Sequence, residues 1–162
     1  MPQKKLKNHT LDQYLKILSE KTPTPGGGSV AALTGALAVG LISMVAQYSL
    51  GKSKDKAVER KIAKILSQSQ KIRDQFLELV DLDAQAYQKV VAARRLSKSK
   101  QRTAAQAARK VPIKICRICY QAIDLTPYLV VYGNQYLLSD IKVALELLEA
   151  AFQSAQALIN TE

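Results

Sequence analysis

The sequence predicts an all-α protein, a bundle of five or six helices that forms one domain over residues 1–162. Three observations lead to this prediction. Apolar residues recur at helical spacing along most of the chain, and long alternating segments rich in Val and Thr, the pattern of β-strands, are lacking. The composition, with 48% hydrophobic and 23% charged residues among 162, is that of one globular domain.

The first predicted helix covers Leu11–Ser19 and is amphipathic. Thr10 precedes it as an N-cap, because its hydroxyl can accept a hydrogen bond from an amide of the first turn. The helix ends before Pro23, which cannot continue it. Its apolar face carries Leu11, Tyr14, Leu15 and Leu18.

Residues 22–51 contain no charged side chain. Pro25 is followed by three glycines, which can adopt positive φ or let another group approach the backbone closely. Ser29 is then expected to cap a helix that runs to about Gly51. The free amides at that N-terminus would suit an anion.

This helix, Ala- and Gly-rich from Val30 onward, admits three interpretations. About 20 apolar residues are enough to cross a bilayer, but polar residues dilute this segment and no secretion signal precedes it. The second interpretation is a central helix of a soluble bundle, buried on all sides. A ridge of Ala32, Ala36 and Gly40 would let another helix approach closely. The third interpretation adds a ligand at the glycine-rich turn.

A long amphipathic helix is predicted over about residues 54–95. At 1.5 Å per residue it would measure about 60 Å. A helix of that length in a small chain implies a partner, either through oligomerisation or in an elongated bundle.

The remaining elements are shorter. A polar, basic connection is expected at residues 96–100. The next helix covers about residues 104–123, with a kink or break at Pro112. A loop or short turn is predicted for residues 124–135, and the last helix begins between residues 136 and 139.

The formal net charge of +11 is concentrated in the middle of the chain. Residues 84–123 carry ten basic side chains and no acidic one. Such a segment attracts an anionic partner, either nucleic acid or a polyanionic small molecule. Nucleic acid is not favoured, because aromatic residues interleaved for base stacking are lacking.

The two cysteines, Cys116 and Cys119, form a CxxC pair. A zinc site would need two more ligands, and the one histidine, His9, is near the N-terminus. Apolar neighbours favour two reduced thiols in the core, and no metal site is expected. Reduced thiols and no recognisable signal peptide together suggest a cytoplasmic protein.

Familiar catalytic constellations are missing from the sequence. It has no histidine pair, nucleophile elbow or P-loop. Carboxylates, Tyr, Ser, Asn, Lys or Arg would have to carry any chemistry.

Residues 24–32, TPGGGSVAA, resemble the signature of the cyclodeaminase/cyclohydrolase family of folate-processing domains. Further motifs similar to those of the family follow in the same order. In the motif at residues 93–98, Ser97 replaces the usual proline, and the C-terminal part of the family domain is expected to be missing or shortened. The matching motifs are DAQAY at 83–87, ARRLSK at 93–98, VPI at 111–113, Gly133-Asn134 and Ser139-Asp140.

The resemblance implies chemistry on a one-carbon tetrahydrofolate as substrate, with no tightly bound cofactor. A cyclohydrolase opens 5,10-methenyltetrahydrofolate with water, whereas a cyclodeaminase closes 5-formiminotetrahydrofolate and expels ammonia. Both reactions need proton transfer at a carbon between two nitrogens, a task for a carboxylate. The expected catalytic residues are Asp83 and Asp140. The expected binding residues are Gly26, Gly27, Gly28 and Ser29 in the pocket wall, Tyr87 and Asn134 orienting the substrate, and Arg94, Arg95 and Lys98 on its glutamate carboxylates.

Each of these residues also has a purely structural interpretation. Asp83 and the basic cluster can be solvated, Asp140 can be a first-turn acid, Asn134 a turn residue and Tyr87 a core residue.

Several functions remain open. A cyclohydrolase is expected over a cyclodeaminase, because no transferase domain accompanies the chain to deliver a formimino substrate. A homodimer is expected, with a folate partner that can be polyglutamylated. The alternative is a non-catalytic folate-binding or helical interaction protein of the same fold, which Ser97 and the shortened C-terminus favour.

Overall fold

The computed structural model describes residues 5–160, and this part of the chain is all-α, as the sequence predicts. The predicted count of five or six helices is confirmed by six α-helices, accompanied by two short 3-10 helices. In chain order they are η1 (Leu6–Asn8), α1 (Leu11–Ser19), α2 (Gly27–Ser49), α3 (Lys56–Ala93), α4 (Lys98–Ile123), α5 (Thr126–Tyr132), η2 (Gln135–Leu137) and α6 (Leu138–Asn160).

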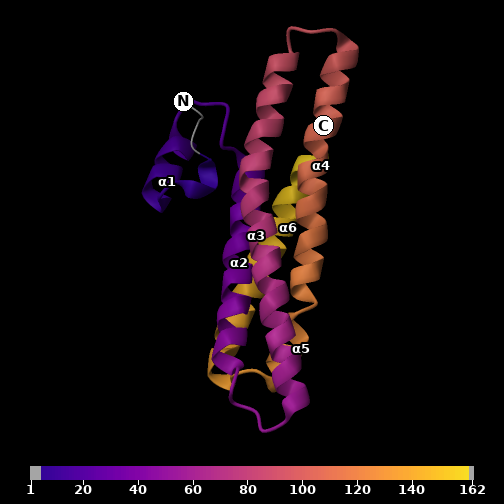
Figure 1. Cartoon of the computed structure of the whole chain (residues 1–162). Coiled ribbons are helices and arrows are strands. Elements are labelled where there is room, and N and C mark those ends of the chain that lie inside the picture. Colours follow the sequence, from indigo (N-terminus) through magenta and orange to yellow (C-terminus); the bar gives the residue numbers. More distant parts are fainter. Residues whose placement is uncertain (1–4, 161–162) are drawn as a thin grey trace.

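Helices α2, α3, α4 and α6 form an elongated bundle, with α1 beside one end of it (Figure 1). Helix α2 packs against α3 and α6, and α4 packs against the same two helices. The hairpin formed by α3 and α4 extends beyond the ends of α2 and α6. An elongated bundle therefore accommodates the long helix that the sequence predicts.

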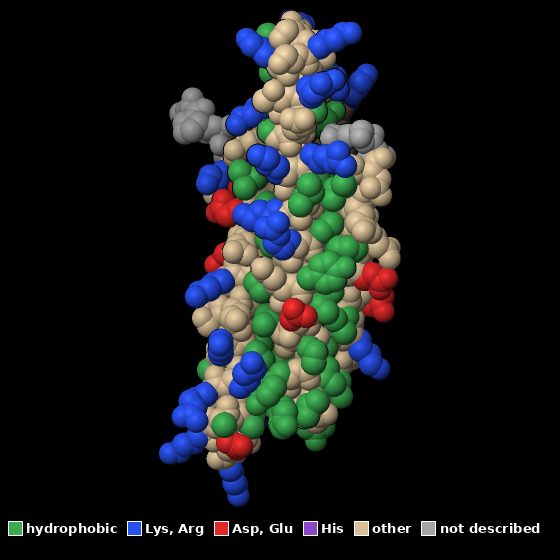
Figure 2. Space-filling model, turned by 90° about the vertical axis from the view of Figure 1, so that its right-hand side faces the viewer, with side chains coloured by type: hydrophobic (Ala, Val, Ile, Leu, Met, Phe, Trp, Pro, Cys, Tyr) green, Lys and Arg blue, Asp and Glu red, His purple; other side chains and the backbone are tan. Residues whose placement is uncertain are grey.

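Basic side chains gather at the protruding end of the hairpin, at the top of Figure 2. Those of Arg94, Arg95 and Lys98 are exposed there. Lower on the same face hydrophobic side chains gather where α4 and α5 lie (Figure 2). Tyr120 of α4 and Val131 of α5 are 60% and 65% exposed.

The contact between α2 and α3 depends on a glycine, but not on the one that the ridge of small residues suggests. A Cβ atom at Gly35 would lie 2.5 Å from Cε1 of the fully buried Phe76. Of the predicted ridge, Ala32 and Ala36 are buried, whereas at Gly40 no atom of another described element lies within 4 Å of the Cβ position.

Helix α2 is long and apolar enough to cross a membrane by length and composition alone, and 56% of its most apolar window is buried in the bundle. The expectation that it is buried on all sides is wrong. Leu37 and Tyr48 are 55% and 60% exposed. The apolar side chains of α2 therefore contribute to the core on one side of the helix only.

The structure refines two predictions for the second half. At Pro112, where a kink or break is expected, helix α4 continues without a break, because Val111, Pro112 and Ile115 are all buried against the bundle, and this packing favours the helix despite the missing amide. The expected loop at 124–135 contains α5, which begins with Pro127 in its first turn, a position where proline favours a helix.

Candidate active site

A pocket of about 330 Å³ lies where the N-terminus of α2 meets α3, α4 and the end of α6. We call it the Asp83 pocket. It brings together five of the predicted site residues, which are Gly26, Gly27, Gly28, Asp83 and Tyr87.

The carboxylate of Asp83 lies against the first turn of α2. A Cβ atom at Gly28 would be 2.0 Å from Asp83 Oδ1, so this carboxylate can keep its position only beside a glycine. The first turn of a helix has amides without intrahelical partners, and the N–H of Ser29 donates to the Asp83 carboxylate. Helix α2 is therefore capped from a neighbouring helix.

This arrangement corrects the prediction that Ser29 caps α2. The N-cap is Gly26, which offers no side chain for a hydrogen bond. Of the three glycines in the turn, Gly28 serves close approach, and none serves an unusual backbone angle, because Gly51 is the one glycine with positive φ among residues 5–160.

Burial raises the pKa of the Asp83 carboxyl above its ordinary value, and the hydrogen bond from the Ser29 amide opposes this effect only in part. A raised pKa brings the carboxyl closer to the state in which it can both accept and donate a proton near neutral pH. Asp83 is thus suited to proton transfer at the pocket wall.

Behind the pocket wall, Ser29 is fully buried and does not line the pocket. Its hydroxyl pairs with the hydroxyl of Tyr14 at 2.9 Å. Burial raises the pKa of Tyr14, and the charge of Asp83 adds to this. Sequence reasoning placed Tyr14 on the apolar face of the first helix, and no local signal marks it as a neighbour of the site.

Three further pocket residues, Ala108, Arg109 and Pro112, come from α4 and were not predicted. Arg109 brings a positive charge to the wall. Pro112 has no N–H to donate to the carbonyl of Ala108, so a backbone acceptor lacks its usual helical partner beside the pocket. The VPI motif at 111–113 was the available signal.

The three predicted basic residues lie above the pocket. Arg94 Nη2 donates to the hydroxyl of Tyr87 at 3.4 Å, which places it at the pocket edge. Arg95 and Lys98 are exposed at the end of the hairpin and do not line the pocket.

Asn134 and Asp140 lie at the other end of α2. The N–H of Asn134 donates to Ser49 Oγ at 2.8 Å, and its side chain accepts from the amide of Tyr136 at 3.0 Å. Asp140 is in the first turn of α6. A helix of 23 residues is about 33 Å long, so one chain does not bring these residues to Asp83.

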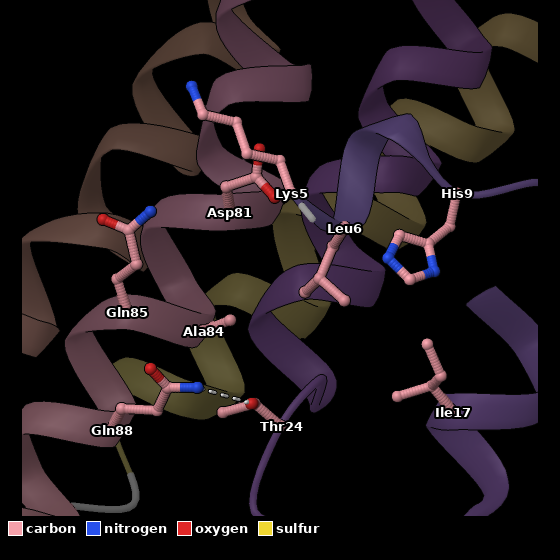
Figure 3. Close-up of a pocket in the computed structure, with 9 residues that line it drawn as sticks. All are labelled: Lys5, Leu6, His9, Ile17, Thr24, Asp81, Ala84, Gln85 and Gln88. Atoms are coloured by element: carbon pink, nitrogen blue, oxygen red, sulfur yellow. Dashed lines mark hydrogen bonds between the residues drawn. The ribbon is translucent and has the colours of Figure 1, made fainter. Parts of the chain in front are cut away.

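A second pocket, of about 340 Å³, lies between the N-terminal segment and α3 (Figure 3). Thr24 belongs to both pockets, and Gln88 Nε2 donates to its hydroxyl at 3.3 Å. Asp81 is 4% exposed; its Oδ1 accepts from the amide of Lys7, while its Oδ2 has no hydrogen-bond partner among residues 5–160.

The groups that could bind metal or react as thiols are few. No three His, Cys, Asp or Glu side chains between residues 5 and 160 are grouped so as to hold a metal ion. Cys116 and Cys119 are free thiols. Burial raises the pKa of Cys119 to about 12, which makes it a poor nucleophile.

The glycine-rich turn and Asp83 both lie in the part of the chain that matches a known protein family. The sequence model of the formiminotransferase-cyclodeaminase family matches residues 10–161. The chain belongs to this family. Its members include cyclohydrolases and cyclodeaminases of folate one-carbon metabolism.

Individual relatives agree with this assignment. The methenyltetrahydrofolate cyclohydrolase of Methylorubrum extorquens is 33% identical over 158 residues, which cover 91% of this chain and 76% of the relative. The formimidoyltransferase-cyclodeaminase of Rattus norvegicus is 30% identical, and the match covers 98% of this chain but 32% of that protein.

A solved structure shows the same fold. The formiminotetrahydrofolate cyclodeaminase of Thermotoga maritima superposes with a TM-score of 0.91 at 28% identity, over 95% of this chain and 78% of that chain.

Proposed function

We propose that this protein is a 5,10-methenyltetrahydrofolate cyclohydrolase that produces 10-formyltetrahydrofolate. The observation that carries the proposal is the Asp83 carboxyl, with a raised pKa, in a pocket formed by the family's glycine-rich motif. The cyclohydrolase that is 33% identical over nine-tenths of this chain supports this activity.

The proposed reaction adds water to the carbon that bridges N5 and N10 of the substrate. Asp83 accepts a proton from the water as its oxygen bonds to this electrophilic carbon. The carbon–N5 bond then breaks, N5 receives a proton, and the hydroxyl loses one to give the formyl group on N10. One water is consumed and one proton is released in the whole reaction.

Other residues of the pocket would bind and orient the substrate. Tyr87 lines the pocket from the same helix as Asp83, and its hydroxyl accepts a hydrogen bond from Arg94. The Arg109 guanidinium offers a cation for a carboxylate of the glutamate tail. The carbonyl of Ala108 offers an acceptor for a substrate N–H.

A cyclodeaminase is the second candidate, and the solved structure with a TM-score of 0.91 favours it. In that reaction N10 attacks the formimino carbon of 5-formiminotetrahydrofolate and its proton passes to the imino nitrogen. The bond from the carbon to this nitrogen then breaks as the nitrogen takes a second proton and leaves as ammonia. The same carboxyl would then act as an acid, which its raised pKa also suits.

The two activities can be separated by assays of the purified protein. We expect loss of methenyltetrahydrofolate, followed by absorbance, well above the spontaneous rate. Asp83→Asn should abolish it, whereas Asp140→Asn, the same change at the other end of α2, should retain it. A rate at background for the wild type would exclude the cyclohydrolase, and ammonia release from formiminotetrahydrofolate would then establish the cyclodeaminase. Equal loss in both variants would contradict the role assigned to Asp83.

We also propose that the protein works as a homodimer. The exposed apolar side chains of α2 support this proposal, because contiguous apolar surface commonly marks an interface. Sedimentation of the purified chain over a concentration series tests it, and a monomer throughout would refute it.

A further inference from the structure

The pocket between the N-terminal segment and α3, of about 340 Å³, takes no part in the proposed reaction. We call it the Asp81 pocket. Asp81 and Asp83 are two residues apart on α3, so their side chains point to different sides of the helix, about 200° apart around its axis. Thr24 lines both pockets, but each carboxylate lines only its own. The Asp81 pocket is therefore a separate cavity beside the Asp83 pocket.

The carboxylate of Asp81 is buried in the wall of this pocket and is only half satisfied. Asp81 is 4% exposed, and its side chain points from α3 toward the N-terminal segment (Figure 3). Its Oδ1 accepts from the amide of Lys7 at 3.3 Å, whereas Oδ2 has no hydrogen-bond partner among residues 5–160. A buried carboxylate oxygen destabilises a protein unless some group supplies a donor.

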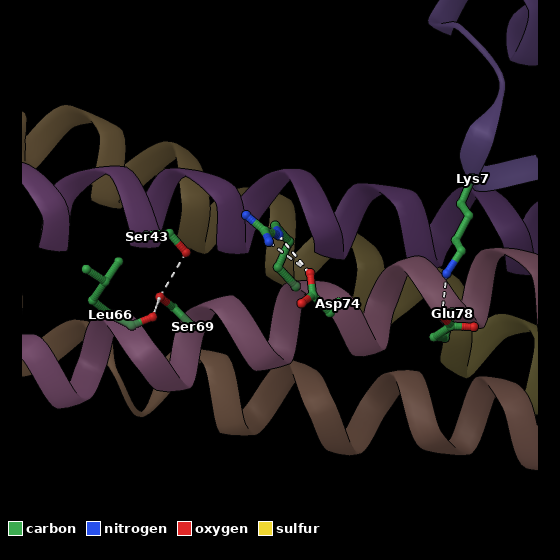
Figure 4. A network of polar contacts seen from close by, with 7 residues as sticks. Lys7, Ser43, Leu66, Ser69, Asp74 and Glu78 are labelled. Atoms are coloured by element: carbon green, nitrogen blue, oxygen red, sulfur yellow. Dashed lines mark hydrogen bonds and ion pairs between the residues drawn. The ribbon is translucent and has the colours of Figure 1, made fainter.

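The imidazole of His9 has an unpaired atom in the same pocket. Between residues 5 and 160, Asp81 Oδ2 and His9 Nδ1 are the two buried side-chain atoms without a hydrogen-bond partner, and both residues line the Asp81 pocket. Buried polar side chains elsewhere in the bundle are paired, as Ser43 is with Ser69 Oγ at 2.8 Å (Figure 4). The unpaired atoms thus gather at one cavity, which indicates that this cavity receives a ligand.

The charge of Asp81 has no partner in an ion pair within residues 5–160. The side chain of Lys7 pairs with Glu78 of α3 instead (Figure 4). Lys5 lines the pocket but is exposed, and no ion pair joins it to Asp81. A ligand that complements this buried carboxylate must therefore carry a positive charge.

The free oxygen and the apolar walls define the rest of the ligand. Because Oδ1 is already engaged, a compact ammonium that needs one carboxylate oxygen fits better than a two-pronged guanidinium. Leu6, Ile17 and Ala84 line the same pocket and suit an alkyl group. The volume is also far more than one water molecule or an inorganic ion needs.

We propose that the Asp81 pocket binds a small primary amine in its ammonium form, with a short apolar body. The ammonium donates to Asp81 Oδ2, and His9 Nδ1 offers a second acceptor from the N-terminal segment. The apolar body lies against Leu6 and Ile17. The inference does not rest on the proposed reaction, because binding can be measured without any folate substrate.

His9 is the one histidine of the chain, so its imidazole gives a single set of NMR signals at the pocket. The purified full chain is titrated at constant pH with butylammonium, butanol and butyrate, which have similar alkyl bodies and differ in the charge of the head group. Butylammonium should shift the His9 signals saturably. The formal charge of +11 keeps cations from collecting on the surface, so a saturable shift reports a specific site. No saturable shift with butylammonium, or an equal one with butanol or butyrate, would overturn the proposal.

Methylammonium tests the apolar walls in the same titration. Each buried CH₂ group strengthens binding about fourfold, so the dissociation constant of methylammonium should be about tenfold or more above that of butylammonium. Equal dissociation constants would show that the pocket takes a bare cation, and would refute the proposed class of ligand.

Asp81→Asn tests the charged acceptor. It should raise the dissociation constant of butylammonium about tenfold or more, because the ammonium loses the carboxylate that it pairs with. Asp74→Asn is the matched control, since it removes the same charge from an exposed residue of α3 that does not line the pocket. It should leave the dissociation constant unchanged. Equal losses in the two variants would show a general effect of charge and contradict the site.

Ala84→Leu tests the location without changing any charge. The larger side chain would occupy the pocket, and leucine favours a helix, so circular dichroism should show an intact bundle while butylammonium binding is lost. Ala86→Leu, the same change on another side of α3 and outside the pocket, should retain binding. Binding that survives both Asp81→Asn and Ala84→Leu would place the amine elsewhere and refute the proposal.

Discussion

The carboxylate of Asp83 rests on the backbone of Gly28, so that a Cβ atom on the glycine would be 2.0 Å from Oδ1. The first turn of one helix and the acidic side chain of another thus hold each other in place. A carboxylate in this position is oriented by the scaffold, which is what a proton-transfer group requires.

Gly28→Ala should displace this carboxylate. We expect the catalytic rate to fall by about 100-fold, because a displacement of an ångström at a reacting group costs about that much. Helix content should be retained, since alanine favours a helix. Steady-state kinetics with circular dichroism measures both. Gly27→Ala is the matched control, because its Cβ would make an ordinary 3.8 Å contact with Leu158. Equal effects of the two variants would contradict the explanation.

Asp83 should determine the acid limb of the pH–rate profile. As a base it works deprotonated, so kcat/KM should fall as the pH falls through its pKa, which burial raises above the ordinary value. A profile that falls only near the ordinary Asp pKa of about 4 would contradict this prediction.

Asp83 should also make the free energy of unfolding depend on pH. Because its pKa is raised in the folded state, the folded protein binds the proton more tightly than the unfolded chain does. Its contribution to stability is therefore greatest at low pH and falls as the pH rises through the folded pKa. Asp83→Asn should remove this dependence and make the protein more stable than wild type at neutral pH. Urea titrations at several pH values measure it, and parallel curves for the two proteins would contradict it.

The Tyr14–Ser29 pair should contribute to stability through its buried hydrogen bond. Tyr14→Phe leaves the hydroxyl of Ser29 without its partner in a fully buried position, at a cost of about 1–3 kcal/mol. The double variant Tyr14→Phe with Ser29→Ala should regain part of this loss. A double-mutant cycle from urea unfolding measures the coupling, and additive effects would show that the two hydroxyls do not interact.

Pro112→Ala should make the protein more stable and at the same time weaken substrate binding. The alanine amide can donate to the carbonyl of Ala108, so the free energy of unfolding should rise by about 1–2 kcal/mol. The same bond removes an acceptor from the pocket wall, and KM should rise about fivefold to tenfold. Pro127→Ala in the first turn of α5, away from the pocket, should leave KM unchanged. If KM of Pro112→Ala is also unchanged, the carbonyl takes no part in binding.

Much of the fold could be predicted from the sequence, because helix periodicity and caps are local properties. Leu11–Ser19 has the predicted bounds and the predicted Thr10 cap. The long third helix was predicted within two residues at each end. The unbroken helix at Pro112, and the helix α5 in place of the expected loop, arise where tertiary packing outweighs a local helix breaker or a turn signal.

The sequence by itself determined the fold class, the helices and the glycine-rich turn, and it pointed to Asp83 through a family motif. Only the tertiary structure decided which groups meet. It joined Asp83 to Gly28, added Tyr14 and Arg109, and left Asp140 at the far end of α2. The reason is physical: periodicity records which face of a helix is buried, but contacts between helices depend on how their side chains fit together in three dimensions.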